Sequence, residues 1–171
     1  PTPLGEGALR TIAPYVISIL HQVQVIIAER GKTARQFLKA TEPERPMQDF
    51  TYHELNKRTP PKQWQSYLDA ALEGKDIGLL SEAGCPGVAD PGADIVALAY
   101  RKGIEVVPLV GPSSILLALM ASGMNGQSFC FHGYLSPKKP QLAQELKRLE
   151  SHARRHKQTQ LFIETPYRNT S

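Results

Sequence analysis

The sequence predicts an α/β fold built on a largely parallel β-sheet. Short apolar runs, such as 23–28 and 76–80, alternate along the chain with stretches of helical periodicity. This alternation is typical of parallel sheets whose strands are joined by helices. Residues 104–109 contain few polar side chains, as expected of a strand that helices cover on both faces.

The helices are predicted from apolar residues spaced by three or four positions, with proline at the start or glycine after the end. In the last of them Leu142, Leu146, Leu149 and Ala153 form one apolar stripe, and the opposite face is basic. The first predicted helix begins near Pro14, and the others cover residues 33–40, 60–72, 93–102, 115–122 and 141–156.

The predicted strands are short and end at polar or glycine-containing turns. They cover residues 23–28, 76–80, 104–109, 129–132 and 159–164. Residues 1–7 and 42–49 are rich in proline, glycine or charged side chains and are predicted to be loops. Residues 52–56 show no clear period and receive no element.

The composition is that of a soluble globular protein. Apolar residues make up 41% of the chain and charged residues 21%, and no apolar run approaches the roughly 20 residues of a membrane span. The N-terminus lacks the pattern of a signal peptide. Cys85 and Cys130 provide neither a disulfide framework nor a zinc-ligand spacing. We therefore expect a cytoplasmic protein with no membrane segment and no metal site.

The net charge of +4 is concentrated in one segment. Residues 138–157 contain seven Lys or Arg and two Glu, a local net charge of +5. Such a segment is a candidate surface for an anionic partner such as RNA. A solvated helix face explains the same pattern without any partner.

The richest candidate for a binding site is the loop at residues 81–92, between a predicted strand and a predicted helix. It contains three glycines, two prolines and two carboxylates. Glycines let backbone amides approach a ligand closely, and α/β folds bind their ligands at the carboxyl ends of parallel strands. The alternative is a tight structural turn in which Glu82 and Asp90 hold the loop or cap the next helix.

Two further stretches carry polar groups that could serve chemistry. The turn at residues 111–114, Gly-Pro-Ser-Ser, offers hydroxyls and amides to a ligand, or caps the following helix. His53 next to Glu54 could form an acid–base pair, although a lone surface histidine is the commoner outcome. His53 has no second ligand nearby in sequence, which argues against a metal site.

Seven short motifs follow one another along nearly the whole chain. They are P-T-P-L-G at 1–5, A-E at 28–29 with Thr33 and Arg35, Y-H-E-L-N at 52–56, S-E-A-G-C-P-G-V-A-D-P-G at 81–92, V-P-L-V-G-P-S-S at 107–114, F-H-G-Y-L-S-P-K at 131–138 and F-I-E-T-P-Y-R at 162–168. In this order they resemble the tetrapyrrole methylase superfamily, and within it the ribosomal RNA small subunit methyltransferase I group. Each motif alone is a weak signal, whereas seven in order are specific.

The resemblance implies a homodimer of two-lobed chains, with S-adenosyl-L-methionine bound in a cleft between the lobes. The N-terminal α/β lobe would cover residues 1–111, and residues 112–171 would form an incomplete C-terminal α/β lobe with a mixed sheet and helices. A further strand is expected before Pro1, and more sheet and helix after Ser171. The implied cofactor-binding residues are Pro3, Gly5, Ser81, Glu82, Ala83, Gly84, Pro86, Asp90, Gly111, Pro112, Ser113, Ser114 and Leu135.

The activity that the resemblance implies is methylation of a ribose 2′-hydroxyl of ribosomal RNA, with the small ribosomal subunit as partner. Methyl transfer of this kind depends mainly on an aligned acceptor, and a base for the hydroxyl proton would help. Two alternatives are a methylase of a small molecule such as a tetrapyrrole, and a non-catalytic RNA-binding dimer. The hypothetical acceptor-side residues are Glu29, Arg35, His53 and Glu54, and the RNA-contacting residues are Lys138, Lys139, Arg154 and Arg155.

The chain departs from the family pattern at several charged positions. Arg30 replaces an Asp, Glu82 replaces the Asp of the glycine loop, Leu55 replaces a His, and Gly31-Lys32 replaces Thr-Arg. These changes fall on the expected acceptor side and in the cofactor loop, so the RNA target stays open. Within that loop, Gly84→Val is expected to abolish cofactor binding while leaving the fold.

Overall fold

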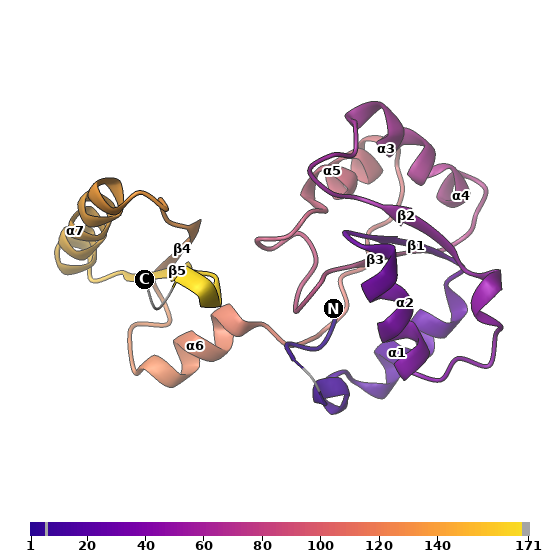
Figure 1. Ribbon diagram of the computed structural model, residues 1–171, viewed down its shortest axis with the longest axis horizontal. Coiled ribbons are helices and arrows are strands. Elements are labelled where there is room, and N and C mark those ends of the chain that lie inside the picture. Colours follow the sequence, from indigo (N-terminus) through magenta and orange to yellow (C-terminus); the bar gives the residue numbers. More distant parts are fainter. Residues whose placement is uncertain (6, 169–171) are drawn as a thin grey trace. The chain divides into compact units, whose positions relative to one another are not determined.

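The computed structural model describes residues 1–5 and 7–168. It divides into two compact units, Pro1–Ser113 and Ser114–Ser171, and each unit has its own sheet (Figure 1). The lobe boundary proposed from the sequence, after residue 111, lies two residues before this division. The α/β class predicted from the sequence is confirmed.

The sheet of the first unit has three parallel strands. The central strand β1 (Val25–Ala28) pairs with β2 (Thr51–Glu54) on one side and with β3 (Ile77–Leu80) on the other. In this register His53 of β2 and Leu79 of β3 both lie beside Ile27. All four residues of β1 are buried, which explains its unbroken apolar sequence, because a central strand has no solvent-facing side.

Helices cover both faces of this sheet (Figure 1). One core cluster joins Leu20 of α1, Leu38 of α2 and Ile26, and the other joins Ile27 to Leu68 and to Ile95 of α5. The α-helices of the first unit are α1 (Pro14–Gln22), α2 (Gly31–Ala40), α3 (Pro61–Tyr67), α4 (Asp69–Leu72) and α5 (Ala93–Arg101), and the short 3-10 helices are η1 (Ala8–Thr11) and η2 (Met47–Asp49).

The second unit is built around one parallel strand pair. Its elements are α6 (Ser114–Ser122), β4 (Phe129–Tyr134), α7 (Lys139–His156), β5 (Thr159–Ile163) and the 3-10 helix η3 (Pro166–Arg168). Strands β4 and β5 are parallel, with Phe129 beside Thr159, and α7 connects them and packs against β5. A mixed sheet was predicted here, whereas the strands that the structure describes run parallel.

Two predicted elements of the first unit differ from the structure: one helix is interrupted, and one strand is absent from the described ladders. The helix expected over residues 60–72 breaks at Leu68, whose ψ of 0° separates α3 from α4. The strand expected over residues 104–109 has no ladder partner among the described residues. Ile104 and Val106 pack against the second core cluster, while Val107 is 66% exposed, so only one face of this segment is covered. Its low polar content therefore does not reflect a strand buried on both faces.

Strand β2 was missed because its side chains follow no simple alternation. Its burial pattern is exposed, intermediate, intermediate, exposed, as befits a strand at the sheet edge. This segment is recognised as a strand by its pairing with β1. Its own sequence does not indicate a strand. None of the helices within residues 1–5 and 7–168 combines the length and the apolar composition that a membrane span requires.

Candidate functional site

The N-terminal opening of the chain is joined directly to the glycine-rich loop at residues 81–92. Thr2 and Gly84 form an antiparallel bridge, in which the Thr2 amide donates to the Gly84 carbonyl at 2.9 Å and the Gly84 amide donates to the Thr2 carbonyl at 3.0 Å. Two segments about eighty residues apart in sequence thus lie side by side.

Buried hydroxyl groups strengthen this junction. Thr2 Oγ1 donates to the Ser81 carbonyl at 3.2 Å and lies 3.0 Å from Ser81 Oγ. Ser81 Oγ in turn donates to the Gly84 carbonyl at 2.6 Å. Thr2 and Ser81 are only 5% and 6% exposed, so these bonds compete little with water and fix the loop to the opening.

The turn at residues 111–114 begins at the same place. A Cβ on Gly111 would overlap the ring of Pro1, so the close approach of these two segments requires glycine. The Cys85 thiol lies 3.5 Å from the Pro112 carbonyl, as a weak donor. Three segments that the resemblance assigns to the cofactor therefore meet within the first unit.

A cavity of about 440 Å³ opens beside this junction. Its walls are the N-terminal opening, one face of α2 and the start of the loop. The lining residues are Thr2, Pro3, Leu4, Gly5, Gly7, Ala8, Leu9, Thr33, Ala34, Gln36, Phe37, Ala40, Ser81, Glu82 and Ala83. Its volume falls in the range of small-molecule sites, roughly 300–1,000 Å³.

The cavity brings together some of the predicted cofactor-binding residues and not others. Pro3, Gly5, Ser81, Glu82 and Ala83 line it. The remaining ones do not line it: Gly84, Pro86, Asp90, Gly111, Pro112 and Ser113 belong to the first unit, and Ser114 and the buried Leu135 belong to the second.

Helix α2 contributes a wall of the cavity that was not predicted from the sequence. Thr33, Gln36, Phe37 and Ala40 line the cavity, at the spacing of three and four that places residues on one helix face. That periodicity was the available signal. It could not show that this face borders a cavity, because the same helix also has a side packed in the core, where Leu38 is fully buried.

Carboxylates gather at the end of β1 and in the loop. Burial raises the pKa of Asp90, and the nearby charges of Glu29 and Glu82 raise it further, although the Glu82 backbone amide donates to the Asp90 carboxylate and opposes the shift. Like charges this close disfavour simultaneous ionisation. A cation bound here would relieve that repulsion.

Of the residues predicted on the acceptor side, Arg35 and Glu54 lie together at the start of α2. Glu54 Oε1 accepts a hydrogen bond from the Gly31 amide at 2.8 Å, and thereby caps the helix from a neighbouring strand. The Arg35 guanidinium lies 4.7 Å from the centroid of the Tyr52 ring, in a cation–π contact. A Cβ on Gly31 would come within 3.3 Å of both Arg35 and Glu54.

His53 does not form an acid–base pair with Glu54. Consecutive residues of a strand point to opposite faces of the sheet, and the His53 ring stacks on Tyr67 of α3, with centroids 4.6 Å apart. The Tyr67 hydroxyl donates to the Glu54 carbonyl at 2.9 Å. The pair that adjacency in sequence suggested is thus separated by the strand itself.

The pH dependence of stability should reveal the environment of His53. Desolvation lowers the pKa of His53, so the folded state holds its proton less tightly than the unfolded chain. The contribution of His53 to stability is therefore present above the unfolded pKa, near 6.5, and is lost as the pH falls below that value and through the lowered pKa of the folded state. We expect His53→Phe, which keeps a ring against Tyr67, to lose less melting temperature between about pH 8 and pH 5 than the wild type. Equal losses in thermal melts would contradict this.

Gly84 constrains the fold as well as the loop. Its φ is 79°, and a Cβ would lie 3.1 Å from Leu4 Cδ2 and 3.4 Å from the Pro112 carbonyl oxygen. Gly84→Val would therefore strain the backbone and separate the opening from the loop. The expectation that this change leaves the fold intact is wrong.

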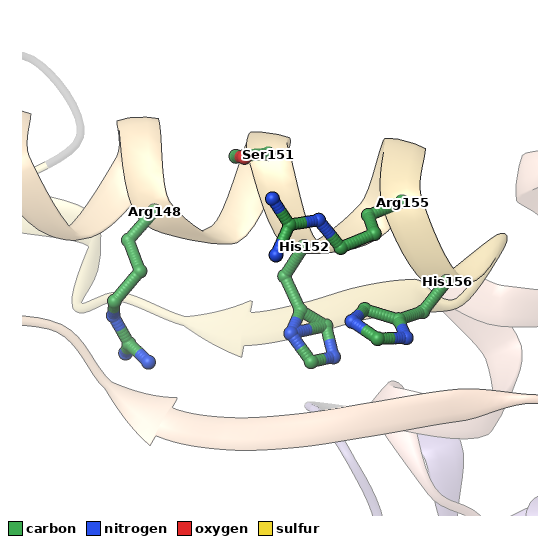
Figure 2. Close-up of a pocket in the computed structure, with 5 residues that line it drawn as sticks. All are labelled: Arg148, Ser151, His152, Arg155 and His156. Atoms are coloured by element: carbon green, nitrogen blue, oxygen red, sulfur yellow. The ribbon is translucent and has the colours of Figure 1, made fainter.

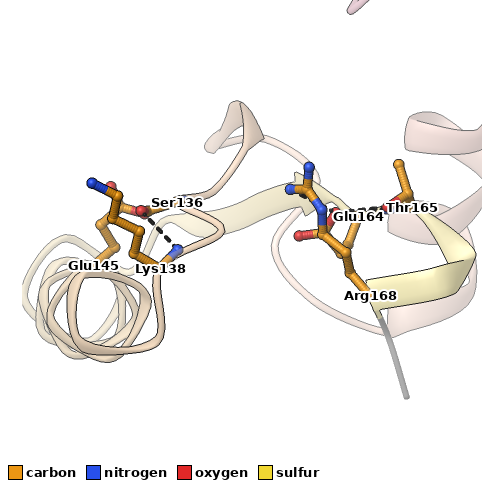
Figure 3. Close-up of polar contacts among 6 residues, drawn as sticks. All are labelled: Ser136, Lys138, Glu145, Glu164, Thr165 and Arg168. Carbon is orange, nitrogen blue, oxygen red and sulfur yellow. Dashed lines mark hydrogen bonds and ion pairs between the residues drawn. The ribbon is translucent and has the colours of Figure 1, made fainter. Parts of the chain in front are cut away.

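The predicted RNA-contacting residues lie at the two ends of α7. Lys138 and Lys139 are exposed at its start, where the Lys138 amide donates to Ser136 Oγ at 3.3 Å and the Ser136 amide donates to Glu145 Oε2 at 2.9 Å (Figure 3). At the other end Arg154 donates to Glu150 Oε1 at 2.6 Å, whereas Arg155 lines a small cavity.

The end of β5 is also polar, as its sequence suggested. Glu164 Oε1 accepts the Thr165 amide at 2.7 Å and lies 3.4 Å from Arg168 Nη1 (Figure 3). These contacts close the turn after the strand, which is what an ordinary exit from a sheet requires. Across the described part of the chain, no group of three or more His, Cys, Asp or Glu residues is placed to hold a metal ion.

Comparisons with known proteins bear on the whole chain. Two relatives named Ribosomal RNA small subunit methyltransferase I, from Bacillus subtilis and from Halalkalibacterium halodurans, are 36% and 34% identical over 98% of this chain. The chain spans about half of their length, 54% in each case. A solved structure of the methyltransferase CobJ matches 95% of this chain and 65% of its own, with a TM-score of 0.61 and 25% identity.

The family comparison extends over nearly every residue. The family described as Tetrapyrrole (Corrin/Porphyrin) Methylases matches residues 3–170, a range that includes the opening, α2, the glycine-rich loop and both strands of the second unit. The fold, the order of the motifs and this match agree, and the chain belongs to the tetrapyrrole (corrin/porphyrin) methylase family.

Proposed function

We propose that this chain is part of an S-adenosyl-L-methionine-dependent methyltransferase that acts on a ribose 2′-hydroxyl of ribosomal RNA. The observation that carries the proposal is the cavity between the opening, α2 and the loop, with carboxylates beside it. The names of the relatives support ribosomal RNA as the acceptor.

The residues present suit the methyl donor. Leu4, Leu9 and Phe37 give the cavity an apolar wall, which a nucleoside base can contact. Glu82 lines the cavity, and Asp90 and Glu29 lie close enough to influence one another. S-adenosylmethionine carries a sulfonium and an ammonium group, and anionic side chains favour both. The full set proposed from the sequence, including the turn at 111–114 and Leu135, remains the proposed cofactor site.

When bound, S-adenosylmethionine would supply an activated methyl group on its sulfonium sulfur. The chain itself has to align an acceptor hydroxyl, exclude water and receive a proton. Glu29, at the end of β1 and beside Asp90, is our candidate for the proton acceptor. Glu54 and Arg35 are positioning residues, because they hold the start of α2, which forms one cavity wall. His53 packs on Tyr67 and is assigned no step.

RNA binding is assigned to the second unit. The exposed cations are Lys138, Lys139 and Arg155, at or within a helix of net positive charge. Arg154 is expected to contribute less to RNA binding, because its guanidinium donates a hydrogen bond to Glu150. Phosphates are the groups that such cations contact. The resemblance further supports a homodimer, and ribosomal RNA as substrate supports a cytoplasmic location.

A small-molecule methylase is the second candidate. The description of the family names corrins and porphyrins, and the solved structure with the same fold is a methyltransferase. The basic helix α7 favours RNA, since a small neutral or anionic acceptor needs no extended row of cations.

Methylation of ribosomal RNA in the cell tests the proposal. Mass mapping of small-subunit ribosomal RNA, from a strain lacking the gene that encodes this chain, should show the loss of one ribose methyl group. Re-expression of the gene should restore it. An unchanged methylation map would contradict the RNA assignment and favour the small-molecule reading.

A further inference from the structure

Helix α7 carries a shallow cavity of about 230 Å³ on its surface. The cavity is lined by Arg148, Ser151, His152, Arg155 and His156 (Figure 2). Arg148, His152 and His156 are spaced by four, and Ser151 and Arg155 form the neighbouring row with the same spacing. Residues four apart on a helix are surface neighbours. All five lining residues belong to α7, so the side chains of this one helix form the cavity.

Every charged side chain that lines the cavity is basic. The two glutamates of α7 are engaged elsewhere: Glu145 accepts the Ser136 amide and Glu150 binds Arg154. Within residues 1–5 and 7–168, neither Arg148 nor Arg155 forms an ion pair. Two guanidinium groups without a carboxylate partner therefore border one cavity.

Two imidazole rings add hydrogen-bond donors at the same place. The centroids of His152 and His156 lie 4.3 Å apart, and the ring planes are tilted by 32°; Figure 2 shows both rings on the same side of α7. The helix dipole accounts for basic residues in the last turn of α7. It does not account for Arg148, which lies two turns earlier, where the dipole has little effect.

We propose that this surface, here named the α7 basic groove, binds the phosphates of an RNA strand. The nine residues from Arg148 to His156 are separated by eight helical rises and therefore extend about 12 Å at 1.5 Å per residue. That length exceeds one phosphate group and accommodates successive phosphates of a backbone. Guanidinium groups are suited to phosphate because their N–H groups match its oxygens in pairs. The inference rests on the proposed function for its choice of RNA.

The proposal gives Arg148 and Arg155 a role that Lys147 and Lys157 do not share. Lys147 is exposed on α7 and Lys157 is exposed at its C-terminal end, and neither lines the groove. Each pair loses two positive charges on replacement by glutamine. The double variant Lys147→Gln/Lys157→Gln is thus a control of equal net charge.

Binding of a short fluorescently labelled single-stranded RNA to the full-length protein, followed by anisotropy at several salt concentrations, tests the groove. We expect Arg148→Gln/Arg155→Gln to weaken binding about tenfold, and the control pair less than about twofold. The slope of log affinity against log salt should fall by about 1.4 for the groove variant, because each lost contact to a single strand removes about 0.7. His152→Asn/His156→Asn should also weaken binding.

Three results would contradict the proposal that the groove binds RNA. Equal losses in the two charge-matched variants would mean that only net charge matters. Displacement of the RNA by millimolar inorganic phosphate alone would mean that the site takes a free anion and not a strand. Absence of RNA binding by the wild type would contradict both the role of the groove and the choice of RNA as partner. Calorimetry with S-adenosylmethionine on the same proteins separates these failures from a failure of the methyltransferase assignment, and thermal melts confirm that the variants fold.

Discussion

Ala83→Trp is expected to weaken S-adenosylmethionine binding by at least about a hundredfold, close to 3 kcal/mol, with little change in melting temperature. Ala83 lines the cavity and is exposed to solvent. A large ring at this position would occupy the space of a ligand without entering the core. The measurements are isothermal calorimetry for affinity and a thermal melt for stability.

Ala97→Trp provides the matched control. Ala97 is exposed on α5 and does not line the cavity, so this variant should bind the methyl donor like the wild type. If Ala83→Trp also binds like the wild type, the ligand lies elsewhere and the cavity is not the donor site. Gly84→Val cannot replace this test, because its positive φ ties any loss of binding to loss of structure.

Asp90→Asn is expected to weaken S-adenosylmethionine binding about tenfold, or about 1.4 kcal/mol, and to leave the binding of S-adenosylhomocysteine nearly unchanged. The two ligands differ in the sulfonium charge. Asparagine can still accept the Glu82 amide, so the variant removes charge and retains the hydrogen bond. Equal losses for both ligands would show that Asp90 does not act through charge.

The pH dependence of S-adenosylmethionine affinity and of stability provides an independent test of the role of Asp90. Because the pKa of Asp90 is raised, its carboxylate forms at a higher pH than in an ordinary aspartate. Affinity for S-adenosylmethionine should therefore rise with pH through that window in the wild type and stay flatter in Asp90→Asn. The folded state binds more protons here than the unfolded chain, so wild-type stability falls over the same window, and the variant should melt slightly higher at neutral pH.

Local sequence patterns determined most of the elements. The stripe on α7, the proline at the start of α1 and the glycines after α5 and α4 each have a physical cause within a few residues, and the structure has helices at these places. Residues 104–109 show where such patterns fail. Their apolar content is equally compatible with an extended segment packed on one side, and only the presence or absence of a paired strand distinguishes the two.

The candidate site depended on long-range contacts that no local pattern contains. The hydroxyls of Thr2 and Ser81 meet across 79 residues, and Gly111 is glycine because Pro1 lies against it. The order of motifs pointed to the opening and to the loop. It could not show that α2 forms the third wall, because that depends on how α2 packs beside the opening and the loop. It also could not show that His53 faces away from Glu54, because residues 52–56 were not recognised as a strand until their pairing with β1 was seen.

Calorimetric titration of the protein with S-adenosylmethionine tests the central claim most directly. We expect one saturable site per chain, with affinity lost in Ala83→Trp, retained in Ala97→Trp and reduced in Asp90→Asn. Absence of heat for both S-adenosylmethionine and S-adenosylhomocysteine, with a protein that melts cooperatively, would contradict the assignment of this cavity to a methyl donor.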